Sequence, residues 1–355
     1  MRKRLKFWGS MEGRNKNNDL FKNVEMGALD EYWKDLLTGA MDFFEAFFRI
    51  LSTTFTKFHE TLVEFSKEKE KAIDFLNSIR RLRALYSVLM LSLACFISLP
   101  DETLNRKEIL SERISRYGAL VYYHWEATKE FLHSITLSFS GLYATSHSLI
   151  RSCVETLTWG IMYDALARCE YRKKAIKELR DLKIESPKSR KWRSWGEFLD
   201  SLGKEDLSSS ARMLDALDGC RWKLKIGVCR RQLVEWKLLE NSESEELKEI
   251  YGELSEYVHR SIPDRTDVGI RVAHEVQYDW VDFEVVSDAF LEFQKNAERA
   301  LRTPILALAR YMSSEIKKSC YSLNRRLFNW ILGSVEILNW RELLDILKSV
   351  EGFFK

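Results

Sequence analysis

The stretch from Met41 to Leu99 contains neither glycine nor proline, the two residues that most often end or bend a helix. Within it, apolar residues recur at steps of four and three: Phe44, Phe48, Leu51, Phe55, Phe58, Leu62 and Phe65. This heptad-like seam is typical of a long helix, or a pair of helices, packed against a neighbour. Pro100 ends the stretch, because proline lacks a backbone amide hydrogen and restricts the residue before it.

The composition extends this helical prediction to the rest of the chain. The 355 residues include only 15 Gly and 4 Pro, which is few for a protein rich in strands and turns. Hydrophobic residues make up 45% and charged residues 31%, so the chain is globular and not disordered. We therefore predict an all-α, multi-helix bundle, in which only residues 268–286 alternate in places like a short β-hairpin.

Breaks in the helical pattern predict four segments. They are a mobile basic arm (1–26), a long N-terminal helical segment (27–100), a helical core (101–265) and a C-terminal helical region (266–355). Within the core, Phe131 to Ile150 is uncharged apart from two histidines and is rich in small residues. Small residues let helices approach closely, so this portion is predicted to lie at the centre of the bundle.

Ala84 to Leu99 is uncharged but shorter than the roughly 20 residues that a bilayer needs. A buried core helix is the favoured interpretation, and membrane attachment is the alternative. The first residues, M-R-K-R-L-K-F-W, lack the apolar core of a signal peptide, so a cytoplasmic location is expected. Glutamine occurs only three times beside abundant Lys, Arg and Glu, a bias that indicates a thermophilic source.

The six cysteines show no C-x-x-C pair and no metal-ligand spacing with the six histidines. They are predicted to be buried or reduced thiols, with a Cys220–Cys229 disulfide as the alternative. Neither a Walker-type loop nor a G-x-G-x-x-G loop occurs, so no cofactor is expected. His133 and His147 are predicted to be hydrogen-bonded histidines of the core.

Charge is unevenly distributed along the chain. Residues 171–237 hold 18 Lys and Arg against 10 Asp and Glu, whereas residues 238–292 hold 4 against 15. One interpretation is that the two stretches neutralise each other across a contact within the chain or within an oligomer. The other is that the basic stretch binds an anionic partner, either nucleic acid or a membrane surface.

Cations interleaved with tryptophan mark the nucleic-acid candidate, because such side chains hold phosphates while stacking bases. The candidate residues are Lys188, Arg190, Lys191, Trp192, Arg193, Trp195, Arg221, Lys223 and Lys225. A loop whose tryptophans pack inward has the same composition and remains the structural alternative.

Two short patterns supply the second candidate site. Arg151 and Glu155 are four residues apart and therefore share one face of a helix bordered by apolar residues. Tyr251, Ser255 and His259 recur every four residues beside an apolar stripe, and so form a polar ribbon able to meet a partner helix. A charged pair beside a core is either a structural link between helices or part of a functional site.

The pattern R-S-x-x-E (Arg151, Ser152, Glu155) followed by Y-x-x-x-S-x-x-x-H resembles uncharacterised helical proteins related to the HEPN superfamily. The resemblance covers about residues 140–263 and implies that the two helices face each other in a bundle. Many HEPN members are metal-independent RNases, in which an imidazole moves a proton and an arginine stabilises phosphoryl charge. It thus implies His259 as acid/base and Arg151 as phosphate clamp, with Glu155, Tyr251 and Ser255 orienting them.

The sequence departs from the nuclease pattern in one respect. HEPN nucleases carry Arg and His four to six residues apart on one helix, and the matching helix here has no such pair. The leading expectation is therefore a defence- or stress-type protein that binds or processes RNA, as an endoribonuclease or as an inactive relative. The alternative is a non-enzymatic scaffold that forms a homo-oligomer through the Phe44–Phe65 seam.

Overall fold

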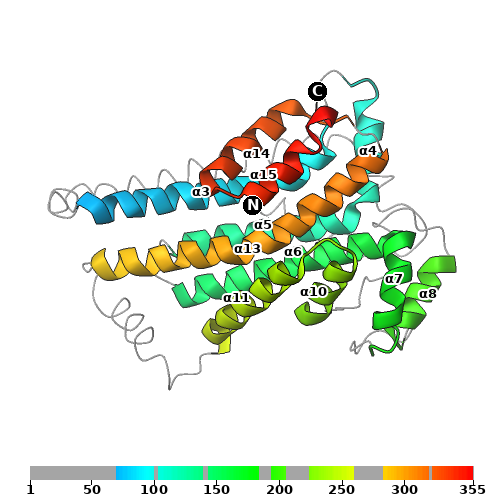
Figure 1. Cartoon of the computed structure of the whole chain (residues 1–355), viewed down its shortest axis with the longest axis horizontal. Helices are drawn as coiled ribbons and strands as arrows, with labels where there is room; N and C mark the ends of the chain where they lie inside the picture. The colour runs from blue at the N-terminus through cyan, green and yellow to red at the C-terminus, as the bar shows by residue number, and fades with distance from the viewer. Residues whose placement is uncertain are drawn as a thin grey trace, which may run out of the picture. The chain divides into compact units, whose positions relative to one another are not determined.

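The computed structural model describes residues 69–99, 103–138, 143–183, 193–204, 224–259, 283–319 and 322–354. All of them belong to one compact unit, Lys67–Lys355. This described part is 86% helical and contains eleven α-helices and no sheet, which confirms the all-α prediction (Figure 1). The predicted N-terminal arm, the Phe44–Phe65 seam and residues 268–282 lie outside the described residues.

The helices are coloured in chain order in Figure 1. They are α3 Lys69–Ile97, α4 Arg106–Arg116, α5 Gly118–Ser138, α6 Tyr143–Ala167, α7 Cys169–Leu179, α8 Trp195–Lys204, α10 Ile226–Glu235, α11 Asn241–His259, α13 Phe283–Ser319, α14 Arg325–Leu338, α15 Arg341–Lys348 and the 3-10 turn η3 Glu351–Phe353. Residues 283–286, assigned by the sequence to an alternating segment, form the first turn of α13.

Helix α6 is the central element of the described bundle. It packs against α5, α7, α10, α11 and α13, and most of its side chains are buried (Figure 1). Its sequence has little amphipathic character because nearly every face meets another helix. The first two turns of α6 belong to the uncharged stretch that the sequence placed at the centre. Ser146, His147 and Ile150 of this stretch are buried, whereas His133 and Thr136 on α5 are exposed.

Small residues bring α5 and α6 into close contact. A Cβ atom added at Gly160 would lie 2.9 Å from the Cβ of Tyr123 on α5, so only glycine fits without a shift. The hydroxyl of Ser134 donates to the carbonyl of Ser146 at 3.0 Å, and the Cys153 thiol donates to the carbonyl of Ala127 at 3.1 Å. These short side chains satisfy backbone carbonyls of the neighbouring helix without holding the two helices apart.

Helix α3 confirms the core interpretation of Ala84 to Leu99. From Val88 onward these residues are all buried, with Val88, Leu89 and Cys95 fully so. The helix packs along α13 and α14 and ends at Ile97, shortly before Pro100. Within the described ranges, no helix combines the length and apolar character needed to cross a membrane.

Arginine side chains close several helix ends. Arg113, only 3% exposed, donates to the carbonyls of Ile97 and Ser98 at 3.1 Å and of Ser322 at 3.2 Å. Arg81 donates in the same way to the carbonyls of the last two residues of α14. The last four carbonyls of a helix have no partner within it, and a guanidinium fork supplies several donors at once.

The acidic face of α11 is neutralised mainly by α13, which runs antiparallel to it. Ion pairs join Arg310 to Glu243, Arg302 to Glu246 and Arg299 to Glu253, and Tyr257 donates to Glu292 at 2.7 Å. From the described residues of the basic stretch 171–237, Arg230 pairs with Glu245 at 2.7 Å. The expected neutralisation thus occurs within the chain, but its main source lies beyond the basic stretch.

Replacing Arg113 with alanine is expected to lower the unfolding free energy by about 3 kcal/mol, because buried carbonyls of α3 and Ser322 lose their donor. Urea unfolding followed by circular dichroism measures the loss. Arg326→Ala on the exposed face of α14 is the matched control and is expected to change stability by less than about 0.5 kcal/mol. Equal stability of the two variants would contradict the structural role of Arg113.

Candidate functional site

The two sequence patterns meet where α6 and α11 pack together. Arg151 donates to the Tyr251 hydroxyl at 2.8 Å, and its guanidinium carbon lies 4.8 Å from the centre of the Tyr251 ring. The Tyr251 hydroxyl in turn donates to the Glu155 carboxylate, which lies 3.4 Å from the Arg151 guanidinium. We name these three residues the Arg–Tyr–Glu clasp. The structure therefore brings Arg151, Glu155 and Tyr251 together across 100 residues of sequence.

The clasp is partly accessible. The side chains of Arg151 and Glu155 are each 21% exposed, so the group lies at the edge of the core and not within it. Burial and the Glu155 carboxylate raise the pKa of Tyr251 to about 12, which keeps the phenol protonated at neutral pH. Every charged group of the clasp already has an opposite charge or a hydroxyl as partner.

The two serines of the patterns are directed elsewhere. Ser255 donates to the carbonyl of Tyr251 in its own helix at 2.6 Å. Ser152 donates at 2.7 Å to Glu130 on α5, a half-buried carboxylate. Burial raises the pKa of Glu130, and the carboxylates of Glu126 and Glu155 act in the same direction.

His259 is the last residue of α11, and its side chain lies outside the described residues. Contacts fix the direction of the two helices, since Tyr257 stacks on His147 at 4.1 Å while Tyr251 meets Arg151 and Glu155. The helices are therefore antiparallel. Eight residues, or a helix rise of about 12 Å, separate His259 from the Tyr251 position that holds Arg151.

The other histidines named from the sequence differ in their surroundings. His147 is buried between the carbonyl of Tyr143, 2.8 Å away, and the amide of Asn296, 3.2 Å away, which confirms its assignment to the core. His133 is exposed, so its assignment to the core was wrong. It lies between buried Phe131 and Ser134 on α5, and helical periodicity turns it toward solvent although its neighbours in sequence are uncharged.

Only part of the predicted nucleic-acid segment belongs to the described structure. Arg193 and Lys225 are exposed, and Lys225 immediately precedes α10. Trp195 is buried to 4% exposure and stacks on Tyr163 at 6.2 Å, so its ring contacts the core rather than solvent. The remaining candidates lie outside the described residues: Lys188, Arg190, Lys191, Trp192, Arg221 and Lys223.

Helix α7 carries a basic surface that the sequence candidates did not include. Lys173, Lys174, Lys177 and Arg180 are exposed, whereas Tyr171, Ala175 and Leu179 are buried on the opposite side. A bridge between Lys183 and Ser194 places Arg193 next to the end of this helix. The spacing of three and four residues in R-K-K-A-I-K-E-L-R was the signal that could have identified this face.

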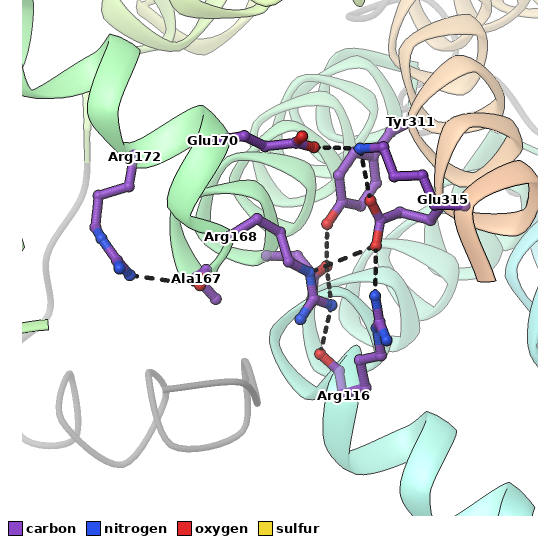
Figure 2. Close-up of polar contacts among 9 residues, drawn as sticks. Arg116, Ala167, Arg168, Glu170, Arg172, Tyr311 and Glu315 are labelled. Carbon is purple, nitrogen blue, oxygen red and sulfur yellow. Dashed lines mark hydrogen bonds and ion pairs between the residues drawn. The ribbon is translucent and has the colours of Figure 1, made fainter. Parts of the chain in front are cut away.

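An ion cluster attaches the start of α7 to α4, α6 and α13 (Figure 2). Arg168, between α6 and α7, donates to the carbonyl of Arg116 at 2.7 Å and lies 3.4 Å from Asp164 and 3.7 Å from Glu315. Tyr311 donates to Asp164 at 2.6 Å, and Arg116 contacts Glu315 at 3.2 Å. Beside them, Lys318 links Glu315 to Glu170.

The centre of this cluster is buried, since Asp164, Tyr311 and Glu315 are at most 2% exposed. Burial alone would lower the pKa of Arg168, but the carboxylates of Asp164 and Glu315 raise it above its usual range. Burial also raises the pKa of Tyr311 well above its usual range. The carboxylates of Asp164 and Glu315 thus balance the positive charge of Arg168, which stays ionised. Such balance is what a buried structural link requires.

Cys95, Cys153 and Cys229 are buried free thiols, and Cys169 is an exposed one. The alternative disulfide between Cys220 and Cys229 is therefore not formed. Among the described residues, no group of three or more His, Cys, Asp or Glu side chains is placed to hold a metal ion.

Comparison with known proteins gave no match: no protein-family model, no curated protein and no solved structure corresponds to the chain. Its own residues therefore carry the functional argument.

Replacing Tyr251 with phenylalanine removes the hydroxyl that joins Arg151 to Glu155 and is expected to cost about 1–2 kcal/mol of unfolding free energy. Because the folded-state pKa of Tyr251 is raised, this contribution is complete below pH 10 and is lost as the pH rises toward 12. Chemical unfolding at several pH values measures it. A double-mutant cycle with Glu155→Gln tests the coupling, and strict additivity would contradict the clasp.

Replacing Asp164 with asparagine is expected to cost about 3 kcal/mol, because the buried Arg168 loses a compensating charge. The control Glu245→Gln removes a 63% exposed carboxylate that pairs with Lys248 and Arg230, and is expected to cost much less because solvent screens these pairs. Chemical unfolding compares the two variants. A stable Asp164→Asn protein would show that the cluster does not depend on this charge.

Proposed function

We propose that the chain is a helical RNA-binding protein, related to the HEPN proteins that its two polar patterns resemble, and that it does not cleave RNA through Arg151 and His259. The observation that carries the proposal is the exposed positive charge between α7 and α10. These cations make no ion pair with carboxylates of the described residues: Lys173, Lys174, Lys177, Arg180, Lys183, Arg193 and Lys225. Unpaired cations gathered on one segment attract a polyanion by charge and counterion release.

The clasp supports binding without cleavage. In metal-independent RNA cleavage, the acid/base and the phosphate clamp must reach one phosphodiester group. Arg151 is occupied by Tyr251 and Glu155, and a helix rise of about 12 Å separates Tyr251 from His259. Releasing Arg151 for a phosphate would leave the partly buried Glu155 carboxylate without its cation. This arrangement favours a link between helices over a catalytic pair.

The proposal is tested with the full-length protein in two assays of the same samples. Anisotropy of fluorescent RNA is expected to show binding that weakens as salt rises, while gel analysis with EDTA present shows intact RNA. His259→Ala and Arg151→Ala are expected to leave both results unchanged, apart from a stability loss in Arg151→Ala that circular dichroism detects. Failure of the wild-type protein to bind any RNA would refute the proposal. Cleavage that disappears in His259→Ala would instead establish the endoribonuclease.

A further inference from the structure

The outer face of α7 presents a short row of cations in fixed geometry. Lys173, Lys177 and Arg180 are separated by four and three residues, so they lie on one side of the helix, with Lys174 beside them. The row from Lys173 to Arg180 spans a rise of about 10 Å. All four side chains are exposed, while the opposite side of the helix is buried in the bundle.

The carboxylates of α7 do not cancel this charge. Glu170 pairs with Lys318, and Glu178 pairs with Arg231 at 2.8 Å and also accepts from Gln232. Between residues 169 and 183, Asp181 is the remaining acidic residue, against six Lys and Arg. The face therefore keeps a local excess of positive charge, although the net charge of the whole chain is only +3.

Aromatic side chains near this face are turned inward. Tyr171, Trp195 and Trp236 are 7%, 4% and 4% exposed, and Tyr171 packs edge-on against Trp236. The exposed large hydrophobic residues of the described part belong to α3, α5, α14 and the turn before α4. Single-strand recognition depends on bases stacking on exposed aromatic rings. The described part of this surface offers charge and no stacking platform.

Helix α7 is also held firmly at both ends, which favours binding because little order is lost on association. The buried ion cluster around Arg168 fixes its first turn (Figure 2). At its other end the backbone of Gly196 approaches so closely that an added Cβ would lie 2.9 Å from the carbonyl oxygen of Arg180. The amide of Trp195 donates to the carbonyl of Leu182 at 3.0 Å.

We infer that the outer face of α7 binds the phosphate backbone of duplex RNA by charge alone, without reading the bases. The inference rests on the proposed RNA-binding function and names the form of RNA that this surface takes. A surface that binds by charge alone is expected to bind a duplex more tightly than a single strand. Each neutralised phosphate contributes about 0.9 to the salt slope of a B-form duplex and about 0.7 for single strands, and we expect A-form RNA to follow the duplex.

The test compares three variants of the full-length protein. Lys173→Gln/Lys174→Gln/Lys177→Gln removes the charge of the face, and Lys173→Arg/Lys174→Arg/Lys177→Arg preserves it. The matched control, Arg326→Gln/Arg341→Gln/Lys348→Gln, removes the same charge from exposed positions of α14 and α15. The probes are two RNA duplexes of about 20 base pairs with unrelated sequences, and oligo(U) of equal length. The duplexes exceed the roughly 16 base pairs that known double-stranded-RNA-binding domains contact. Circular dichroism verifies that each variant is folded.

The Lys→Gln variant is expected to bind both duplexes roughly 100-fold more weakly at 0.15 M salt, with a salt slope smaller in magnitude by about 2–3. The Lys→Arg variant and the matched control are expected to bind as the wild-type protein does. Duplex binding that survives in the Lys→Gln variant would overturn the inference and leave the proposed function standing. So would a preference for oligo(U), for one duplex sequence, or for phosphatidylserine vesicles over RNA. A wild-type protein that binds no RNA would overturn both.

Discussion

Guanidinium groups bound to helix-end carbonyls are the interaction on which this bundle depends. Arg81, Arg113 and Arg168 each reach the carbonyls that end a different helix, and Arg310 reaches the turn after α10. A chain with 15 glycines has few residues suited to the left-handed caps that usually end helices. Left-handed residues occur after α14 at Asn339 and after α10 at Lys237, and arginine adds contacts from distant helices at these and other helix ends. A single arginine contact therefore both satisfies the carbonyls at a helix end and joins that helix to its neighbour in the bundle.

Two Arg–carboxylate pairs at i,i+4 spacing lie on α6 or at its end, and their surroundings give them different properties. Arg151 and Glu155 are each 21% exposed, and Tyr251 of α11 lies between them. Asp164 and Arg168 are 0% and 11% exposed. On α13, Tyr311 donates a hydrogen bond to Asp164, and Glu315 forms an ion pair with Arg168. The spacing alone is identical in the two cases. Burial by α13 turns the second pair into an internal link, while the first remains at an edge that solvent reaches.

The sequence predicted what depends on periodicity. The absence of glycine and proline predicted a long helix, of which α3 is the described part. The small residues of the stretch from Phe131 to Ile150 predicted a close approach of helices, and the hydrogen bond from Ser134 to the Ser146 carbonyl is one such contact. The resemblance to HEPN-related proteins implied that the helices of Arg151–Glu155 and Tyr251 face each other, whereas periodicity showed only that each polar residue borders an apolar stripe. The contacts of Tyr251 with Arg151 and Glu155 bring these residues together. Whether these residues act on RNA depends on a ligand, and periodicity carries no information about that.

Contacts between distant segments were not predictable in the same way. Tyr311, which donates to Asp164, lies 147 residues away in the sequence, and a lone aspartate in an apolar run does not predict such a partner. Counting charges along the chain likewise assigned the acidic face of α11 to the basic stretch, whereas arginines of α13 neutralise it. Trp195 lies beside cations in sequence, yet its ring packs on Tyr163 because the first turn of α8 faces the core. The composition of a segment does not say which of its residues are buried, or which other helix buries them.

The attachment of α7 has a consequence for local opening of the protein. Most of α6 is buried by five neighbouring helices, so its amide hydrogens are exposed to solvent only when the whole bundle unfolds. Helix α8 packs on α7, and α7 joins the bundle through its buried face and through the ion cluster around Arg168. Because part of this connection is a set of charges, loss of the cluster would expose the amide hydrogens of α7 and α8 before those of α6. The attachment of these two helices is thus partly electrostatic, whereas α6 is held by packing against five helices.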